Sequence, residues 1–338
     1  MTKLSVVIPC YNKSDYLIEM IECIINQTFS DWELILVDDG SDDYNFDKVH
    51  EFVKSDSRIC HIRRNRLPKN GDTCRNIGIE AAKGEYLIIF DADDRITDSC
   101  FENRVRFMES HPDCDYASFP SVSFVDGTKM YKRRAFNTDG NNLLEAILSA
   151  NYPFTVWGNI YRRSSIGNIR WDEELYIYQD FDYMLQCVLA NLKHEWAVGY
   201  EADYYYRIFR NGNSVCSKVV SPEKTKSTLY LFEKTLNIIN KQTDSKRLKD
   251  YFMNFILIQF EQLLLSAKHK DVLNFISTVE RFYPTEAPKM RSFLINRKAP
   301  PYTHWQLFKL YYRLYNLFKL KVYFIYMTHE LVKSVIKR

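Results

Sequence analysis

The feature that most constrains the fold is a short apolar run that leads directly into three carboxylates, within residues 84–94. Residues 86–90 are apolar, β-prone and preceded by a glycine, which is typical of a strand buried in the middle of a parallel sheet. Asp91, Asp93 and Asp94 follow at the carboxyl end of this strand, where open α/β sheets bind their ligands. Three like charges so close together repel one another unless a cation or hydrogen-bond donors compensate them.

A hard divalent metal, Mg²⁺ or Mn²⁺, would compensate this charge well. Such an ion binds carboxylate oxygens and completes its shell with water and phosphate oxygens. The alternative is an acidic turn that caps a helix beginning near Thr97. The stretch alone is compatible with both interpretations.

The chain before this strand alternates between strand and helix patterns. We predict strands at residues 4–9, 32–37, 58–62 and 84–90, and helices from Ser14 to about Gln27 and over residues 70–82. Polar turns follow these strands on the same edge of the expected sheet. The order indicates a right-handed βαβ nucleotide-binding fold, a mostly parallel sheet flanked by helices.

The second half of the chain has a different character. Of 338 residues, 46% are hydrophobic, which is enough apolar material for two domains. Glycine is absent after residue 212, and helical periodicity predicts helices at residues 228–240, 248–266, 272–283 and 303–338. We therefore predict an α/β domain over residues 1–215 and a helical domain over residues 216–338.

Cysteine usage and hydropathy bear on the compartment. The eight cysteines are scattered without a C-x-x-C pair, which is typical of reduced thiols and predicts a cytoplasmic protein. The richest apolar stretch, residues 252–265, is interrupted by four polar residues and is too short to cross a membrane. We expect a protein that is soluble or peripheral at the inner face of the plasma membrane.

The C-terminal tail has a net charge of +9, whereas the remainder of the chain has a net charge of −6. Residues 285–338 hold eleven Lys and Arg against two Glu, although the whole chain has a net charge of only +3. This asymmetry indicates an anionic partner, a membrane surface or nucleic acid. Aromatic and basic side chains recur at helical spacing at Trp305, Phe308, Lys309, Tyr312, Arg313 and Tyr315. Such a helix suits an anionic membrane interface, and the alternative is packing on the other helices or on a second subunit.

Five short motifs occur in a specific order. They are Ser5-Val6-Val7-Ile8-Pro9-Cys10-Tyr11-Asn12, Gln27-Thr28, Val37-Asp38-Asp39-Gly40-Ser41, Asn70-Gly71 with Arg75-Asn76, and Asp91-Ala92-Asp93-Asp94. With these motifs the first hundred residues resemble the family 2 glycosyltransferases of GT-A fold. The resemblance implies a UDP-sugar donor, a divalent metal (Mn²⁺ or Mg²⁺) and inversion at the anomeric carbon. It also implies a glycan or lipid-linked saccharide acceptor, as in bacterial surface polysaccharide synthesis, and no nucleic-acid partner.

The resemblance assigns donor-binding roles to five residues. The backbone near Pro9, the ring of Tyr11 and the carboxylate of Asp39 would hold the uracil base, with Tyr11 stacking on it. Arg75 would contact the base or the diphosphate, because a guanidinium suits phosphate better than an ammonium does. Asp91 would bind the ribose hydroxyls. The structural alternatives are helix capping for Asp39 and an ordinary surface arginine for Arg75.

By the same analogy Asp93 would bind the metal, and Asp94 is the alternative because two adjacent carboxylates cannot be ranked from sequence. The general base is predicted to be Asp180, in Gln179-Asp180, where the family usually has Glu-Asp. Asp182 is the alternative base. An acidic first helical turn would explain both carboxylates without catalysis.

Three functions are therefore compatible with the sequence. The first is the glycosyltransferase, and the second is a nucleotide-sugar-binding protein that has lost catalysis, for which the missing Glu at Gln179 is the best support. A sugar nucleotidyltransferase would share the sheet and the carboxylates. That activity generally needs a Gly-rich basic loop after the first strand, and residues 9–14 do not form one.

Overall fold

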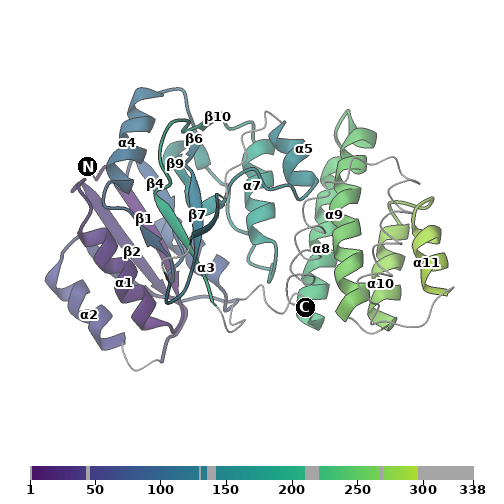
Figure 1. Cartoon of the computed structure of the whole chain (residues 1–338), viewed down its shortest axis with the longest axis horizontal. Coiled ribbons are helices and arrows are strands. Elements are labelled where there is room, and N and C mark those ends of the chain that lie inside the picture. Colours follow the sequence, from purple (N-terminus) through teal and green to yellow (C-terminus); the bar gives the residue numbers. More distant parts are fainter. Residues whose placement is uncertain are drawn as a thin grey trace. The chain divides into compact units, whose positions relative to one another are not determined.

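The computed structural model describes residues 2–42, 46–128, 131–134, 142–209, 221–266 and 269–295. These residues form two compact units (Figure 1). The first lies within residues 1–217, and the second contains residues 221–266 and 269–295 together with residues 148–150. The predicted tail helix, with Trp305 and its neighbours, lies outside the described residues.

A seven-stranded sheet forms the centre of the first unit, in the order β10-β6-β9-β4-β1-β2-β3. Its strands are β1 (Leu4–Cys10), β2 (Trp32–Asp38), β3 (Ile59–Arg63), β4 (Tyr86–Ile89), β6 (Tyr116–Ser118), β9 (Asn159–Arg162) and β10 (His194–Trp196). Within this sheet β9 runs antiparallel to its two neighbours, and the other paired strands are parallel. The predicted α/β fold with a mostly parallel sheet is confirmed.

The predicted strands are central because they are almost wholly apolar. β1, β2 and β4 are buried along nearly their whole length, as expected for parallel strands covered on both faces. The helices between the strands are α1 (Ser14–Ile25), α2 (Phe46–Ser55), α3 (Gly71–Ala81) and α4 (Cys100–Ser110). Helix α3 packs directly on β1, since a Cβ at Gly78 would lie 2.2 Å from Val7 Cγ1. Early in α3, Arg75 reaches Asp91, which lies just beyond the carboxyl end of β4.

A second sheet of four strands lies in the same unit, in the order β5-β11-β7-β8. Its strands are β5 (Arg95–Ile96), β7 (Ser121–Val125), β8 (Tyr131–Arg134) and β11 (Tyr204–Ile208). The consecutive strands β6 and β7 belong to different sheets, and Phe119 and Pro120 lie between them. As a result, β11 pairs with the strand that directly follows the acidic segment.

The remaining elements complete the two units. Within residues 142–209 they are α5 (Leu143–Leu148), the short 3₁₀ helix η1 (Val156–Gly158), α6 (Arg163–Ile166) and α7 (Gln179–Leu189). The second unit contains α8 (Pro222–Ile239), α9 (Ser245–Ser266), α10 (His269–Glu280) and α11 (Ala287–Ile295). Phe232 of α8 contacts the rings of Phe252, Phe255 and Phe275, so an aromatic cluster joins α8, α9 and α10. Among the described residues no helix has the length and apolar character needed to cross a membrane.

Candidate active site

The acidic segment lies directly after β4, at the carboxyl edge of the large sheet. Asp91, Asp93 and Asp94 each offer a carboxylate oxygen, and these oxygens lie within 4.8 Å of one another. An all-oxygen set of this kind matches the preference of Mg²⁺ and Mn²⁺. The three side chains differ in exposure, because those of Asp91 and Asp93 are 26% and 21% exposed whereas Asp94 is buried.

Asp94 is engaged by β11. One of its oxygens accepts a hydrogen bond from the Arg207 backbone N–H at 2.7 Å, and the other accepts from the Tyr204 hydroxyl. Burial, followed by the charges of Asp91 and Asp93, raises the pKa of Asp94 well above its ordinary value. Of the two carboxylates that sequence could not rank, Asp94 thus holds the loop to β11, and Asp93 is the more accessible to an ion.

Arg207 also fixes the neighbouring main chain. Its Nε donates to the backbone carbonyl of Asp93 at 2.5 Å, and its Nη1 donates to Asp126 at 2.6 Å. Its guanidinium lies 4.7 Å from the Tyr16 ring centroid and 4.8 Å from that of Phe124. A buried arginine that follows the acidic segment by more than a hundred residues therefore helps to fix its position.

Arg75 lies in α3 and is enclosed by protein groups. Its Nη1 donates to Asp72 Oδ1 at 2.7 Å, and its Nη2 donates to Asp91 Oδ1 at 2.9 Å. The guanidinium carbon lies 4.9 Å from the Trp157 ring centroid and 4.6 Å from that of Trp171. With 11% of the side chain exposed, Arg75 is not the ordinary surface arginine of the alternative interpretation. It holds Asp91 in place from the side of α3.

Asp72 was not among the predicted site residues. It is fully buried, and its Oδ2 has no hydrogen-bond partner among the described residues. Burial raises the pKa of Asp72 to about 7, against the lowering effect of Arg75, and the charges of Asp180 and Asp172 add to the increase. Its spacing of three residues from Arg75 in a helix was the sequence signal that could have identified this pair.

The residues predicted to hold the uracil base of the donor lie at the ends of β1 and β2. Pro9 is in register with Val37, and the Asp39 N–H donates to the Cys10 carbonyl at 2.8 Å. The Asp39 carboxylate is almost buried and accepts from Arg64, a residue that sequence reasoning did not select. Tyr11 is 48% exposed, and the Lys69 ammonium lies 3.9 Å from the centroid of its ring. Tyr11 and Asp39 thus lie at adjacent strand ends, each beside a cation.

Asp180 lies in the first turn of α7. The helix begins after Tyr178, whose backbone is left-handed with a φ of 64°. Asp180 is half-buried, and no hydrogen bond or ion pair joins its carboxylate to another described residue. Burial raises the pKa of Asp180 to about 6, with Arg75 lowering it and Asp91 raising it. The carboxylate is therefore influenced by the same arginine that holds Asp91.

The alternative base is placed differently. Asp182 is 1% exposed, and its Oδ2 accepts a hydrogen bond from Gln186 Nε2 at 2.7 Å, one turn further along α7. This contact, within a buried helix face, is typical of a structural carboxylate. Gln179, which stands where the family has Glu, points its amide at the Leu175 carbonyl at 3.5 Å.

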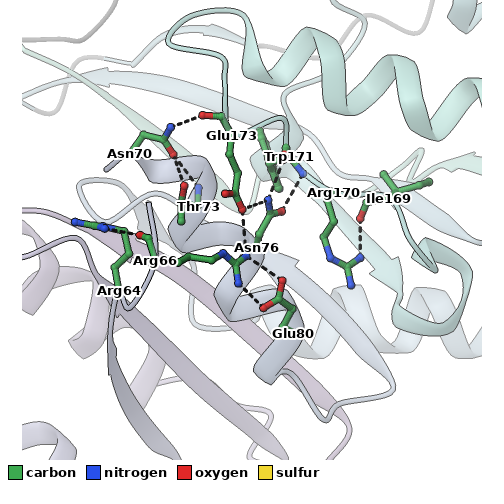
Figure 2. A network of polar contacts seen from close by, with 10 residues as sticks. All are labelled: Arg64, Arg66, Asn70, Thr73, Asn76, Glu80, Ile169, Arg170, Trp171 and Glu173. Atoms are coloured by element: carbon green, nitrogen blue, oxygen red, sulfur yellow. Dashed lines mark hydrogen bonds and ion pairs between the residues drawn. The ribbon is translucent and has the colours of Figure 1, made fainter. Parts of the chain in front are cut away.

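A polar network connects α3 to the segment that leads to α7 (Figure 2). The Asn76 side chain donates to the Trp171 carbonyl at 2.9 Å and accepts from the Trp171 N–H at 2.9 Å. The same amide donates to Glu173 at 2.8 Å, and Glu173 also pairs with Arg66 at 3.1 Å. The Asn70 side chain adds a bond to the Glu173 carbonyl at 2.6 Å. Asn70, Asn76 and Glu173 thus connect the arginine-bearing helix with residues 171–173.

The mostly parallel sheet with helices on its faces and an acidic segment at its carboxyl edge is an α/β arrangement of GT-A type. Residues 5–170 match the family model described as Glycosyl transferase family 2. The chain therefore belongs to the family 2 glycosyltransferases and is a glycosyltransferase, as the sequence motifs predicted.

Relatives and solved structures extend this assignment. The chain is 28% identical over 250 residues to the minor teichoic acid biosynthesis protein GgaB of Bacillus subtilis, a match covering 72% of this chain. The matched region spans only 27% of the length of GgaB. The fold is similar to that of S. aureus TarS residues 1–349 in complex with UDP-GlcNAc, with a TM-score of 0.66 at 20% identity over 86% of this chain and 85% of the other. It is also similar to mannosyltransferase PcManGT of Pyrobaculum calidifontis in complex with GDP-Man and Mn²⁺, with a TM-score of 0.53 at 15% identity over 99% and 86%.

Proposed function

We propose that the enzyme transfers a sugar from a UDP-sugar to a hydroxyl of a glycan or lipid-linked saccharide, with inversion at the anomeric carbon. The observation that carries this proposal is the half-buried carboxylate of Asp180, which has no hydrogen-bond partner among the described residues and is influenced by the charges of Arg75 and Asp91. The relationship to a teichoic acid biosynthesis protein and the fold shared with a UDP-GlcNAc complex support it.

The reaction is a single displacement with one base. The Asp180 carboxylate accepts the proton of the acceptor hydroxyl as its oxygen forms a bond to C1 from the face opposite the diphosphate. The bond from C1 to the diphosphate oxygen breaks, and its electron pair leaves with the UDP. A base with a pKa of about 6 is ionised at neutral pH and still accepts a proton readily.

The acidic segment would hold the metal. Asp93 fits this role because its carboxylate is partly exposed and its oxygens lie close to those of Asp91 and Asp94, while Asp91 would bind the ribose hydroxyls. A divalent cation bound there would neutralise charge on the departing diphosphate. Arg75 orients Asp91, and Arg207 with Asp94 holds the main chain in place. Each of these residues contributes by binding or orientation, and Asp180 is assigned the proton transfer.

The residues proposed to bind the uracil base would lie at the same edge of the sheet, at the carboxyl ends of β1 and β2. Tyr11 offers an exposed ring for stacking, and the Asp39 carboxylate, oriented by Arg64, would accept from the uracil N–H. The backbone near Pro9 completes this proposed pocket. Because neither side chain distinguishes one hexose from another, the proposal extends to the nucleotide and leaves the sugar to the donor panel below.

Hydrolysis of UDP-sugars tests the proposal. The full-length enzyme is incubated with Mn²⁺ and a panel of UDP-glucose, UDP-galactose and their N-acetyl forms, and UDP release is measured beside the thermal shift that each donor causes. Slow hydrolysis of the donor that gives the largest shift is expected. Binding of UDP without turnover of any donor, with or without saccharide acceptors, would instead identify a protein that has lost catalysis.

The tail is assigned to the membrane as part of the same proposal. Residues 303–338 lie outside the described residues, and their basic and aromatic composition favours an anionic lipid surface. Full-length protein should sediment with anionic liposomes at low salt, whereas the deletion of residues 303–338 should stay folded and remain in the supernatant. Equal sedimentation of both proteins, or unfolding of the deletion, would assign the tail a structural role or a role in self-association.

A further inference from the structure

The Asp93 carboxylate already has a cationic partner within the chain. The Nζ of Lys13 lies 2.6 Å from Asp93 Oδ2, and the two side chains are 43% and 21% exposed. Lys13 lies in the segment between β1 and α1, directly before α1. This ion pair therefore occupies one oxygen of the carboxylate that is the more accessible of the two candidate metal ligands.

The backbone of Lys13 is firmly held. Asn12 and Lys13 both have left-handed backbones, with φ of 52° and 59°. The Asn12 N–H donates to Ser41 Oγ at 2.9 Å, and its side chain accepts from the Asp42 N–H at 3.1 Å. The Lys13 carbonyl accepts from the Tyr16 N–H at 3.0 Å and so starts α1. Two strained residues fixed on both sides aim this side chain at the acidic segment.

The ammonium has a second contact besides Asp93. It lies 4.8 Å from the centroid of the Phe209 ring, and this ring packs edge-on against Tyr16. A cation over an aromatic face is stabilised by the ring's quadrupole. An ammonium that loses its bond to Asp93 would therefore keep its contact with the Phe209 ring. This remaining contact lowers the free energy needed to displace the ammonium from Asp93.

We propose that the Lys13 ammonium and the divalent cation are alternative partners of the Asp93 carboxylate, so that Lys13 sets the affinity of the site for its metal. This inference rests on the metal assignment of the proposed function. An ammonium and a divalent cation beside the same carboxylate repel each other, so the binding of one weakens the binding of the other. A divalent ion outcompetes the ammonium through its higher charge, and Lys13 returns when the ion leaves.

A titration with Mn²⁺ alone tests this competition. Full-length, nucleotide-free protein is titrated, and free Mn²⁺ is measured from its electron paramagnetic resonance signal. Lys13→Gln is expected to bind Mn²⁺ about fivefold more tightly than the wild type, the factor that corresponds to the loss of one partly exposed ion pair. Lys13→Gly removes the same ammonium, suits the left-handed backbone and should give the same increase.

Lys69→Gln is the matched control. Lys69 is an exposed cation at the same edge whose ammonium faces the Tyr11 ring, so its removal should leave the Mn²⁺ affinity unchanged. Equal or weaker Mn²⁺ binding in both Lys13 variants would overturn the proposal, as would the absence of Mn²⁺ binding in all proteins. If Asp93→Ala binds Mn²⁺ as the wild type does, the metal assignment itself is wrong. Tighter Mn²⁺ binding by both Lys13 variants, beside a wild type that binds UDP but turns over no UDP-sugar, would leave this inference standing and contradict the proposed reaction.

Discussion

Two regions of the catalytic unit carry carboxylates. In one region the carboxylates are paired with neighbouring groups, and in the other the carboxylate has no such partner within the described part of the chain. In the segment after β4, Asp91 is held by Arg75, Asp93 by Lys13, and Asp94 by the Tyr204 hydroxyl and the Arg207 N–H. In the first turn of α7, no hydrogen bond or ion pair to another described residue holds Asp180.

Under the proposed function, this difference would separate the residues that bind from the residue that takes part in the reaction. A paired carboxylate has a fixed position and a compensated charge, which suits it to orient a ligand or a metal. A carboxylate without a hydrogen bond in a partly desolvated place keeps an elevated pKa and is ready to accept a proton. Arg75 connects the two regions because it bonds Asp91 and lowers the pKa of Asp180.

The largest expected effect is on kcat, and it distinguishes the carboxylate of α7 from those that follow β4. Asp180→Asn should lower kcat by at least about 10²-fold while UDP affinity stays near that of the wild type, because only proton transfer is lost. Steady-state kinetics and calorimetry with UDP measure the two quantities. Asp182→Asn is the control and should be milder, since Asp182 bonds Gln186 within a buried helix face. A dead Asp182 variant beside an active Asp180 variant would reverse the assignment of the base.

The same substitution should stabilise the fold. The folded-state pKa of Asp180 is above its ordinary value, so ionisation of this group opposes folding once the pH exceeds that ordinary value. Asp180→Asn should therefore melt at a higher temperature than the wild type at pH 7.5. The difference should disappear below about pH 4, where the wild-type carboxyl is protonated in both the folded and the unfolded state.

In the segment after β4, substitutions at Asp94 should mainly change stability, whereas substitutions at Asp93 should mainly change metal-dependent UDP binding. Asp94→Ala leaves the buried Tyr204 O–H and Arg207 N–H without acceptors and should lower the free energy of unfolding by about 2–4 kcal/mol in urea. Asp94→Asn keeps an acceptor and should be far closer to the wild type. Asp93→Ala should leave stability nearly unchanged and abolish the metal-dependent part of UDP binding. Unchanged UDP affinity with and without metal in the wild type would remove the role given to Asp93.

The sequence predicted the sheet and the place of the acidic segment because both depend on local patterns. Apolar runs such as residues 86–90 are recognisable as strands, and the residues after them must lie at one edge. The roles of Asp93 and Asp94 could not be separated, because Tyr204 and Arg207 lie 110 and 113 residues from Asp94. Their pairing depends on how the second sheet forms.

Other parts of the site depended on contacts that no local pattern shows. The partnership of Lys13 with Asp93 spans 80 residues, and that of Asn76 with Trp171 spans 95. The replacement of Glu by Gln179 suggested lost catalysis, but Asp180 owes its pKa to burial, Arg75 and Asp91. Long-range contacts therefore decide which groups each carboxylate of the site meets, whereas the local sequence decides where the carboxylate lies.

The pH dependence of turnover is the next prediction. Because a protonated Asp180 cannot accept the acceptor's proton, kcat should fall about tenfold per pH unit below pH 6 and level off above it. Initial rates from pH 4.5 to 8 at saturating donor give the profile, with a check that the protein stays folded at the acidic end. If kcat instead began to fall only near pH 4, the general base would lie in an ordinary, solvated environment.

The smallest expected effect concerns the network that connects the two regions. Glu173→Gln removes the ion pair with Arg66 but keeps an oxygen for the Asn76 amide, so it should cost less than about 1 kcal/mol of unfolding free energy. Asn76→Ala is the matched comparison, since it leaves both the N–H and the carbonyl of Trp171 unpaired and should cost about 2 kcal/mol. Urea unfolding measures both, and kcat should follow the same order because Trp171 lies against Arg75. A larger loss in Glu173→Gln than in Asn76→Ala would mean that the ion pair, and not the amide, holds residues 171–173 to α3.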